Sequence, residues 1–213
     1  MFDYSLVHWT TFLGAALLLN LSPGPDIAFI LGQTVRRGRR AGFAAMGGVW
    51  AGTLVHVFFA SAGLSAILAS SATAFTIVKW VGAAYLVYLG VMAWRSSGLM
   101  VLPDPSEDPL PVRKLVRQGI GVSLLNPKVA IFFLAFLPQF VVEGAGPQWA
   151  QLALHGLLVI VVAALVEPPL VMLSERLTRT WRDQPRIAQW LDRCLGTVFV
   201  SLGFRLAMQG PGN

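Results

Sequence analysis

Two long stretches without a charged side chain constrain the fold of this chain more than any other feature. Neither Ala41–Val78 nor Gly144–Val166 contains an aspartate, glutamate, lysine or arginine. A helix needs roughly 20 apolar residues to span a bilayer, so each stretch can hold a membrane span. Charged residues make up only 12% of the 213 residues, against about 25% in soluble domains. The sequence therefore predicts an all-α integral membrane protein.

Apolar segments divide the chain into six expected membrane spans. The first, Leu6–Val35, is too long for one unbroken helix perpendicular to the membrane. The last, Ile187–Met208, is the weakest because charged residues flank its short apolar part, and an interfacial helix is the alternative there. The other four spans are expected at Gly42–Leu68, Phe75–Trp94, Leu115–Phe140 and Leu152–Leu173.

The positive charges predict how these spans are oriented. Thirteen of the sixteen lysines and arginines lie on one side of the expected membrane, and the basic side should be cytoplasmic. Both termini are then external. This asymmetry explains the net charge of +6, so the expected partner is the lipid bilayer and not nucleic acid. The N-terminal segment lacks a basic start and does not read as a cleaved signal peptide.

A proline-rich acidic segment separates the spans into two halves of three. Ser97–Pro111 contains four prolines and three acidic residues, which is typical of a linker. We therefore divide the chain into a first repeat at residues 1–97, a cytoplasmic linker at 98–114 and a second repeat at 115–213. Because each half has an odd number of spans, two similar halves must insert with opposite topology. A short match between Pro25–Phe29 and Pro127–Ile131 supports this inverted repeat.

Proline-centred breaks interrupt the first and fourth spans. Proline removes a backbone donor and frees the carbonyls before it. Broken backbone is tolerated inside a membrane only where it is buried in protein or lines a cavity. A pair of breaks in corresponding places of two halves indicates the binding site of a transporter. We assign the substrate site to the residues at these breaks: Pro23, Gly24, Pro25, Asp26, Asn126, Pro127 and Lys128.

The charges beside the breaks suit a small zwitterion. Where a helix restarts, its free amides and its dipole favour a carboxylate, whereas freed carbonyls and an acid favour an ammonium group. Asp26 is well placed at a helix N-terminus, but Lys128 opposes the helix dipole and loses solvation there. Lys128 should therefore need a partner, and Asp26 is the expected one. The alternative is that both side chains snorkel to an interface or form a fixed structural pair.

Two further ionisable residues are candidates for proton coupling beside Asp26. His56 has an unperturbed pKa of about 6.5, although a neutral, hydrogen-bonded core histidine is the more common outcome. Glu167 precedes Pro168-Pro169, which we expect to interrupt the fifth span, and an interfacial acid at a helix end is the alternative. Other polar side chains near the breaks should support the site or cap freed backbone, namely Asn20, Ser22 and Ser123.

These motifs together resemble the LysE/RhtB superfamily of bacterial amino-acid exporters over essentially the whole chain. The resemblance rests on Ser22-Pro23-Gly24-Pro25, the glycine-rich Gly47–Gly63, Lys79–Leu86 with Leu89-Gly90, Asn126-Pro127-Lys128, Phe132-Phe133 and Phe136–Phe140. It implies a multi-pass exporter in the bacterial cytoplasmic (inner) membrane, working by proton antiport. The family residues that carry over are Pro23, Gly24, Pro25, Asn126, Pro127 and Lys128. The resemblance does not fix the substrate.

The expected function is therefore secondary export of an amino acid or close derivative, with protons as the coupling partner. A passive small-solute channel, or an exporter of a non-amino-acid metabolite, is the alternative. An enzyme is not expected, because the sequence has neither a His-Glu-x-x-His pair nor a Gly-x-Ser-x-Gly elbow. With three histidines and one cysteine, neither a metal nor another cofactor is expected. Whether the protein forms a homodimer is left open.

Overall fold

Helices make up all the regular secondary structure in the described part of the chain. The computed structural model describes residues 4–22, 24–64, 72–95, 110–174 and 185–208. A helix or a chain of helices lies in each of the six expected segments. In order they are α1 (Leu6–Leu21) with α2 (Pro25–Arg37), α3 (Arg39–Phe58) with η1 (Phe59–Leu64), α5 (Ala72–Arg95), α6 (Val112–Leu125) with α7 (Pro127–Ile131), η2 (Phe132–Phe136) and η3 (Leu137–Phe140), α8 (Gln148–Met172), and α10 (Pro185–Met208).

Two helices are by themselves long and apolar enough to cross a membrane. They cover Arg39–Gly63 and Gln148–Met172. Two further pairs meet the same criteria as single bent spans: α1 with α2, bent by 45°, and α6 with the helices that follow it, bent by 53°. The described residues therefore contain two to four candidate spans, and the six-span inverted repeat stays a prediction. Most of the expected 98–114 linker lies outside the described residues, and α6 already begins at Val112.

The breaks in the first and fourth segments fall where the prolines predict them. α1 ends at Leu21, Gly24 is extended with φ −157°, and α2 begins at Pro25. α6 ends at Leu125, and α7 begins at Pro127. Proline suits the first position of a helix because the amide it lacks would have no intrahelical partner there. The prediction of two broken helices is confirmed.

The third expected interruption, at Pro168-Pro169, is wrong. α8 continues as one α-helix from Gln148 to Met172, with both prolines inside it. A proline removes one backbone hydrogen bond but does not have to end a helix in a membrane, because neighbouring groups can satisfy the freed carbonyl. Glu167 therefore lies within the helix and not beside a gap.

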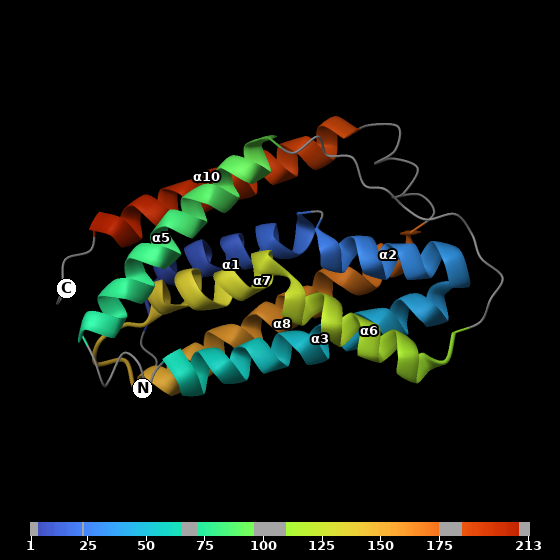
Figure 1. The fold of residues 1–213 in the computed structure, drawn as a ribbon, viewed down its shortest axis with the longest axis horizontal. Coiled ribbons are helices and arrows are strands. Elements are labelled where there is room, and N and C mark those ends of the chain that lie inside the picture. The colour runs from blue at the N-terminus through green and yellow to red at the C-terminus, as the bar shows by residue number, and fades with distance from the viewer. Residues whose placement is uncertain (1–3, 23, 65–71, 96–109, 175–184, 209–213) are drawn as a thin grey trace.

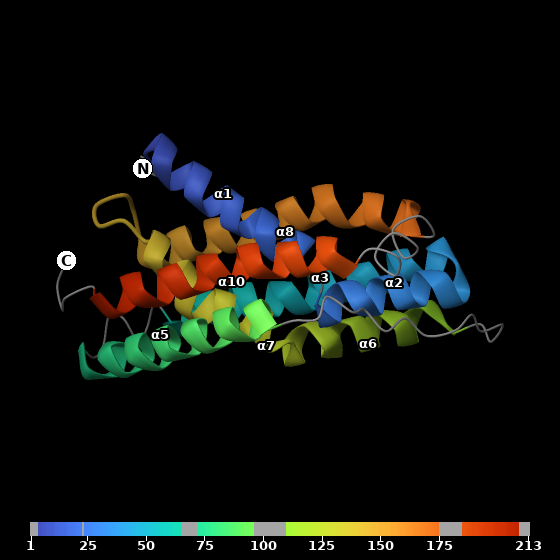
Figure 2. The same cartoon turned by 90° about the horizontal axis from the view of Figure 1, so that it is seen from above.

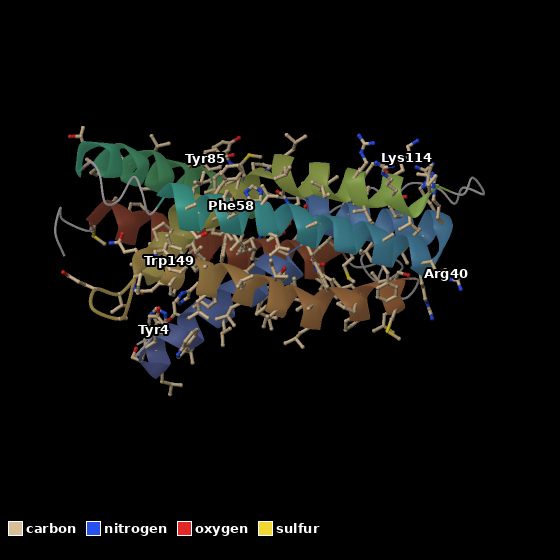
Figure 3. The ribbon with its side chains drawn as sticks, turned by 90° about the horizontal axis from the view of Figure 1, so that it is seen from below. Tyr4, Arg40, Phe58, Tyr85, Lys114 and Trp149 are labelled. Atoms are coloured by element: carbon tan, nitrogen blue, oxygen red, sulfur yellow. The ribbon has the colours of Figure 1, made fainter. Side chains whose placement is uncertain are left out.

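The two broken segments run in opposite directions, and their breaks meet near the middle of the molecule (Figure 1). Arg40 and Lys114 lie at one end of the molecule, whereas Tyr4 and Trp149 lie at the other (Figure 3). The start of α1 and the end of α10 lie at the Tyr4–Trp149 end (Figures 1 and 2). The basic end and the end that carries these helix termini are thus opposite one another.

Glycines let helices of the two expected halves approach closely. A Cβ on Gly119 of α6 would lie 2.5 Å from the carbonyl oxygen of Ala45 in α3, and one on Gly52 would lie 2.6 Å from Ser123 Cβ. Gly90 of α5 and Gly196 of α10 form a similar contact between those two helices, which run side by side (Figure 2). Gly47, by contrast, has no neighbour within 4 Å of its Cβ position. The phenylalanines of η2 fill the main core beneath α1 and α8.

Candidate functional site

Lys128 reaches from the second break to the first. It is the second residue of α7, but its ammonium nitrogen lies 2.9 Å from the carbonyl oxygen of Leu19 and 2.8 Å from that of Ser22. Both carbonyls lie at the C-terminal end of α1, where a helix leaves backbone acceptors unpaired and its dipole favours a cation. The ammonium group of Lys128 thus lies away from the positive N-terminal end of α7 and binds the negative C-terminal end of α1.

Asp26 lies in the same cavity as Lys128, but its Oδ1 atom accepts no hydrogen bond from the lysine. This oxygen is buried and has no hydrogen-bond partner among the described residues. The carboxyl group lies beside the side-chain amide of Asn126, yet the Nδ2 atom of Asn126 is also left without a partner. The ammonium of Lys128 is hydrogen-bonded to carbonyls instead, so a direct Asp26–Lys128 contact stays a prediction.

Asn126 caps the helix that follows the second break. Its side chain is 1% exposed, and its Oδ1 atom accepts the backbone N–H of Lys128 at 3.0 Å. This bond satisfies one of the amides that a helix N-terminus leaves unpaired. Asn126 therefore supports the backbone of the break, and its buried side-chain amide lies beside the carboxyl group of Asp26.

One cavity brings together four of the residues proposed from the sequence. The space in it that a water-sized molecule can enter is about 30 Å³, so the cavity is narrow in this structure. Asn20, Asp26, Lys128 and Glu167 contribute its polar side chains, together with Trp50 and Thr53. The rest of the wall is apolar and consists of Leu19, Ile27, Val49, Val129, Phe133, Val159, Ile160 and Ala163. The arrangement places two acids and one base against a hydrocarbon surface at the level of the breaks.

Glu167 is held inside this cavity by a tryptophan that the sequence analysis did not single out. The residue is 4% exposed, so the interfacial alternative does not describe it. The indole N–H of Trp50 donates to Oε2 of Glu167 over 2.7 Å. Glu167 comes from α8 and Trp50 from α3, so this hydrogen bond ties the two expected halves together at the cavity wall.

His56 lies outside the cavity lining and is hydrogen-bonded in the helix packing. Its Nε2 atom is 3.1 Å from the carbonyl oxygen of Ser123. A carbonyl can only accept, so Nε2 carries the proton. The hydroxyl of Ser123 in turn lies 3.2 Å from that of Thr53. His56 is thus hydrogen-bonded and half-buried, and its role in proton coupling stays a prediction.

Ser22 connects the first break to a buried acid on α10. Its hydroxyl donates to Oδ1 of Asp192 over 2.7 Å, and its carbonyl accepts from Lys128. Asp192 is 6% exposed and was treated only as a charge flanking the sixth span. An acid within an apolar segment is a sign of function in itself, and that signal could have identified it.

The remaining break residues shape the space around the charges. A Cβ on Gly24 would lie 3.2 Å from Nζ of Lys128, so glycine leaves room for the ammonium. Pro25 and Asn126 line an open groove between α2 and α6, and the side chain of Pro127 is exposed. Pro23 lies outside the described residues. In the described part of the chain, no group of three or more potential ligands is arranged to hold a metal.

Comparison with known proteins identifies the family. The model of the LysE type translocator family matches residues 17–210. The chain belongs to this family. LysE translocators are membrane transporters and not enzymes.

Similar proteins cover almost the whole chain. The homoserine/homoserine lactone efflux protein of Salmonella typhimurium is 33% identical over 93% of this chain and 95% of its own length. An uncharacterized membrane protein of Vibrio cholerae is 31% identical over 93% of this chain and 96% of its own length. The leucine efflux protein of Klebsiella pneumoniae is 26% identical, with 96% and 97% covered. No solved structure matches this LysE-family chain.

Proposed function

We propose that this protein exports an amino acid or a close derivative from the cytoplasm in exchange for protons. The cavity at the two breaks is its substrate site. The basic end marked by Arg40 and Lys114 faces the cytoplasm, and the end with Tyr4 and Trp149 faces outward, as positive charges prefer the cytoplasmic side. The protein then lies in the cytoplasmic membrane with both termini external.

The cavity's charges carry this proposal. A zwitterionic amino acid presents an ammonium and a carboxylate a short distance apart. The unpartnered Oδ1 of Asp26 is an acceptor for the ammonium group. Lys128, which lines the cavity, is the donor for the carboxylate. Buried polar atoms without partners are costly, so a ligand that completes their hydrogen bonds binds selectively over one that does not.

The apolar wall of the cavity suits a substrate with an uncharged side chain. Eight hydrocarbon-rich side chains face the polar cluster, and such surfaces bind apolar groups through the hydrophobic effect. The named relatives are efflux proteins for homoserine, homoserine lactone and leucine, all of which carry side chains without charge. Small neutral amino acids are therefore the first substrates to test.

Proton coupling is assigned to the carboxyl groups of the cavity. Asp26 and Glu167 both line it, so proton binding and substrate binding occur in the same space. Exchange follows if a protonated carboxyl group no longer holds the substrate's ammonium, because one occupant then replaces the other. His56 is the weaker candidate, since it is hydrogen-bonded to Ser123 outside the lining.

Reconstituted transport tests this function. Proteoliposomes loaded with a neutral amino acid should release it against its own gradient when an inward proton gradient is imposed. Collapsing that gradient with an ionophore should abolish uphill export. Uphill export that persists without any gradient contradicts antiport. Efflux that does not saturate and never runs uphill would favour the passive channel, and release of non-amino-acid metabolites alone would favour the other alternative.

The membrane arrangement has its own test. Single cysteines introduced near residue 4, near Lys114 and after Met208, in a chain whose Cys194 is replaced by serine, should react with an impermeant reagent from opposite sides. We expect outside labelling at the two terminal positions and inside labelling beside Lys114. Chemical cross-linking of the same membranes tests the homodimer.

A further inference from the structure

A pair of histidines lies at the end of the molecule that carries Tyr4 and Trp149. His8 belongs to α1 and His155 to α8, and their Nε2 atoms are 2.8 Å apart. Nδ1 of His155 lies 2.8 Å from the carbonyl oxygen of Gln151. Because a carbonyl only accepts, Nδ1 of His155 must carry a proton. In the neutral pair, Nε2 of His155 is therefore the acceptor and Nε2 of His8 is the donor.

Aromatic rings hold both imidazoles in this position. Tyr4 stacks on His8 with ring centroids 4.3 Å apart, and Trp9 stacks on His155 at 5.5 Å. Phe12 and Phe140 contact His155 from α1 and η3. Among these neighbours Tyr4 is the titratable one, and its hydroxyl donates to Oε1 of Gln151 over 3.0 Å.

Gln151 holds the residues around the two histidines in place. It is 1% exposed, accepts the N–H of Val142, and donates to the carbonyls of Val142 and Gly146. The loop before α8, the start of α8 and the residue before α1 are thereby joined around the histidines. The ring of His155 cannot turn away without breaking its bond to Gln151, and the ring of His8 cannot do so without breaking its bond to His155.

We propose that His8 and His155 form one proton-binding site that holds α1 against α8 until a second proton arrives. The first proton goes to Nδ1 of His8. This needs no rearrangement and makes the Nε2–H···Nε2 bond charge-assisted, and therefore stronger. A second proton must go to Nε2 of His155, which is already the acceptor. Two N–H groups and two positive charges would then face each other across 2.8 Å, so the pair separates.

The site links proton binding to the contact between the two expected halves. α1 belongs to the first half and α8 to the second, and the cavity of the breaks lies deeper along the same helices. Only the statement that this end faces outward rests on the proposed function. With that orientation, external acid loosens the outer contact between α1 and α8. The carboxyl group of Glu143, exposed in the loop before α8, is the other titratable group at this end.

Nitrogen NMR on the histidines tests the site without any transport assay. The chain has three histidines, so the 15N-labelled protein in lipid nanodiscs gives a small, assignable set of imidazole signals. We expect His8 and His155 to titrate together in two steps more than about one pH unit apart, as coupled groups do. Independent single-step titrations of His8 and His155 would overturn the proposal.

A matched variant and a distance measurement complete the test. His155→Gln keeps a polar side chain but removes the second titrating ring, so His8 should then titrate in one step; an unchanged two-step curve contradicts coupling. Spin labels at Leu6 and Trp149, which are both exposed, should separate by several ångströms during the second step in a Cys194→Ser background, and should not do so in His155→Gln. A separation that stays constant through that step refutes release.

Discussion

The ammonium of Lys128 donates a hydrogen bond to the carbonyl oxygen of Ser22, 2.8 Å away on the other broken helix. Together with its bond to Leu19, this contact joins the two breaks into one structural unit. The cation neutralises the negative end of α1 and fills acceptors that the break would leave open. Lys128 is thus part of the architecture of the break as well as a candidate ligand for substrate.

Lys128→Met should impair transport strongly. The substitution keeps the apolar stem but removes a charged donor to two buried carbonyls, each such bond contributing roughly 1.5–3 kcal/mol to stability. It also removes the cation that we propose binds the substrate's carboxylate, so we expect a loss of at least about 10-fold in rate, equivalent to about 1.4 kcal/mol. Initial efflux rates in proteoliposomes measure the loss, normalised to the amount of folded protein recovered by size-exclusion chromatography. A variant that folds and transports at the wild-type rate would remove Lys128 from the site.

Gly24→Ala should reduce transport through crowding of the Lys128 ammonium. The new Cβ would lie 3.2 Å from Nζ, although the extended backbone of Gly24 accepts alanine without strain. Gly14→Ala in α1 is the matched control, since a Cβ there has no neighbour within 4 Å. We expect slower efflux for Gly24→Ala and wild-type efflux for the control. Equal rates in both variants would show that the space beside Nζ has no function.

Asp26 and Lys128 should show coupled losses if both hold the same substrate. Asp26→Asn removes the charge at an oxygen that has no partner among the described residues, so folding should survive while substrate affinity falls. The double variant Asp26→Asn/Lys128→Met should lose less than the sum of the two single losses, because residues that act on one ligand are not additive. Strict additivity in transport free energy argues for independent roles.

Glu167→Gln should uncouple the transporter and not simply inactivate it. Glutamine is nearly isosteric and keeps an oxygen that can accept the indole N–H of Trp50, but it cannot take up a proton. We expect substrate exchange at equilibrium to persist while proton-driven uphill export is lost. Comparing both assays on one preparation separates coupling from folding. Uphill export at the wild-type level would transfer the coupling role to Asp26.

The contact between α3 and α6 predicts opposite effects for two glycines on one helix. Gly119→Ala would place a Cβ 2.5 Å from the carbonyl of Ala45 and should destabilise the fold by about 1–3 kcal/mol. Gly121→Ala meets nothing within 4 Å and should be neutral or stabilise the helix by up to about 1 kcal/mol. Thermal unfolding in detergent compares them. Equal midpoints would mean that the close approach at Gly119 relaxes at little cost.

Local chemistry made the breaks predictable from the sequence. Pro25 and Pro127 start new helices because of constraints within a few residues, and Asn126 caps its helix through its own neighbour. The long-range partners were not predictable in this way. Trp50–Glu167, Ser22–Asp192 and His8–His155 join residues more than a hundred positions apart, and no periodicity encodes such pairings. The backbone carbonyls that bind Lys128 were missed for another reason. A buried cation was expected to need an acidic partner, but backbone oxygens can also accept its hydrogen bonds.

The prediction of a break at Pro168-Pro169 was wrong because it relied on the prolines alone. The same residue type begins a helix at Pro25 and Pro127 but lies inside one in α8. At the two true breaks, glycine or asparagine adopts extended backbone just before the proline. Glu167 precedes Pro168 without such a residue. The proline alone was therefore an insufficient signal, and the residue before it was the informative one.

Carbonyl oxygens that converge inside a protein are also what sodium and potassium ions coordinate. At the first break two such oxygens already hold a tethered ammonium. An inorganic cation cannot coordinate these two oxygens while they are bonded to the ammonium of Lys128, which is covalently attached to the chain. Under the proposed function, Lys128 thus leaves the space beside the break to an organic substrate and keeps inorganic cations from these two oxygens.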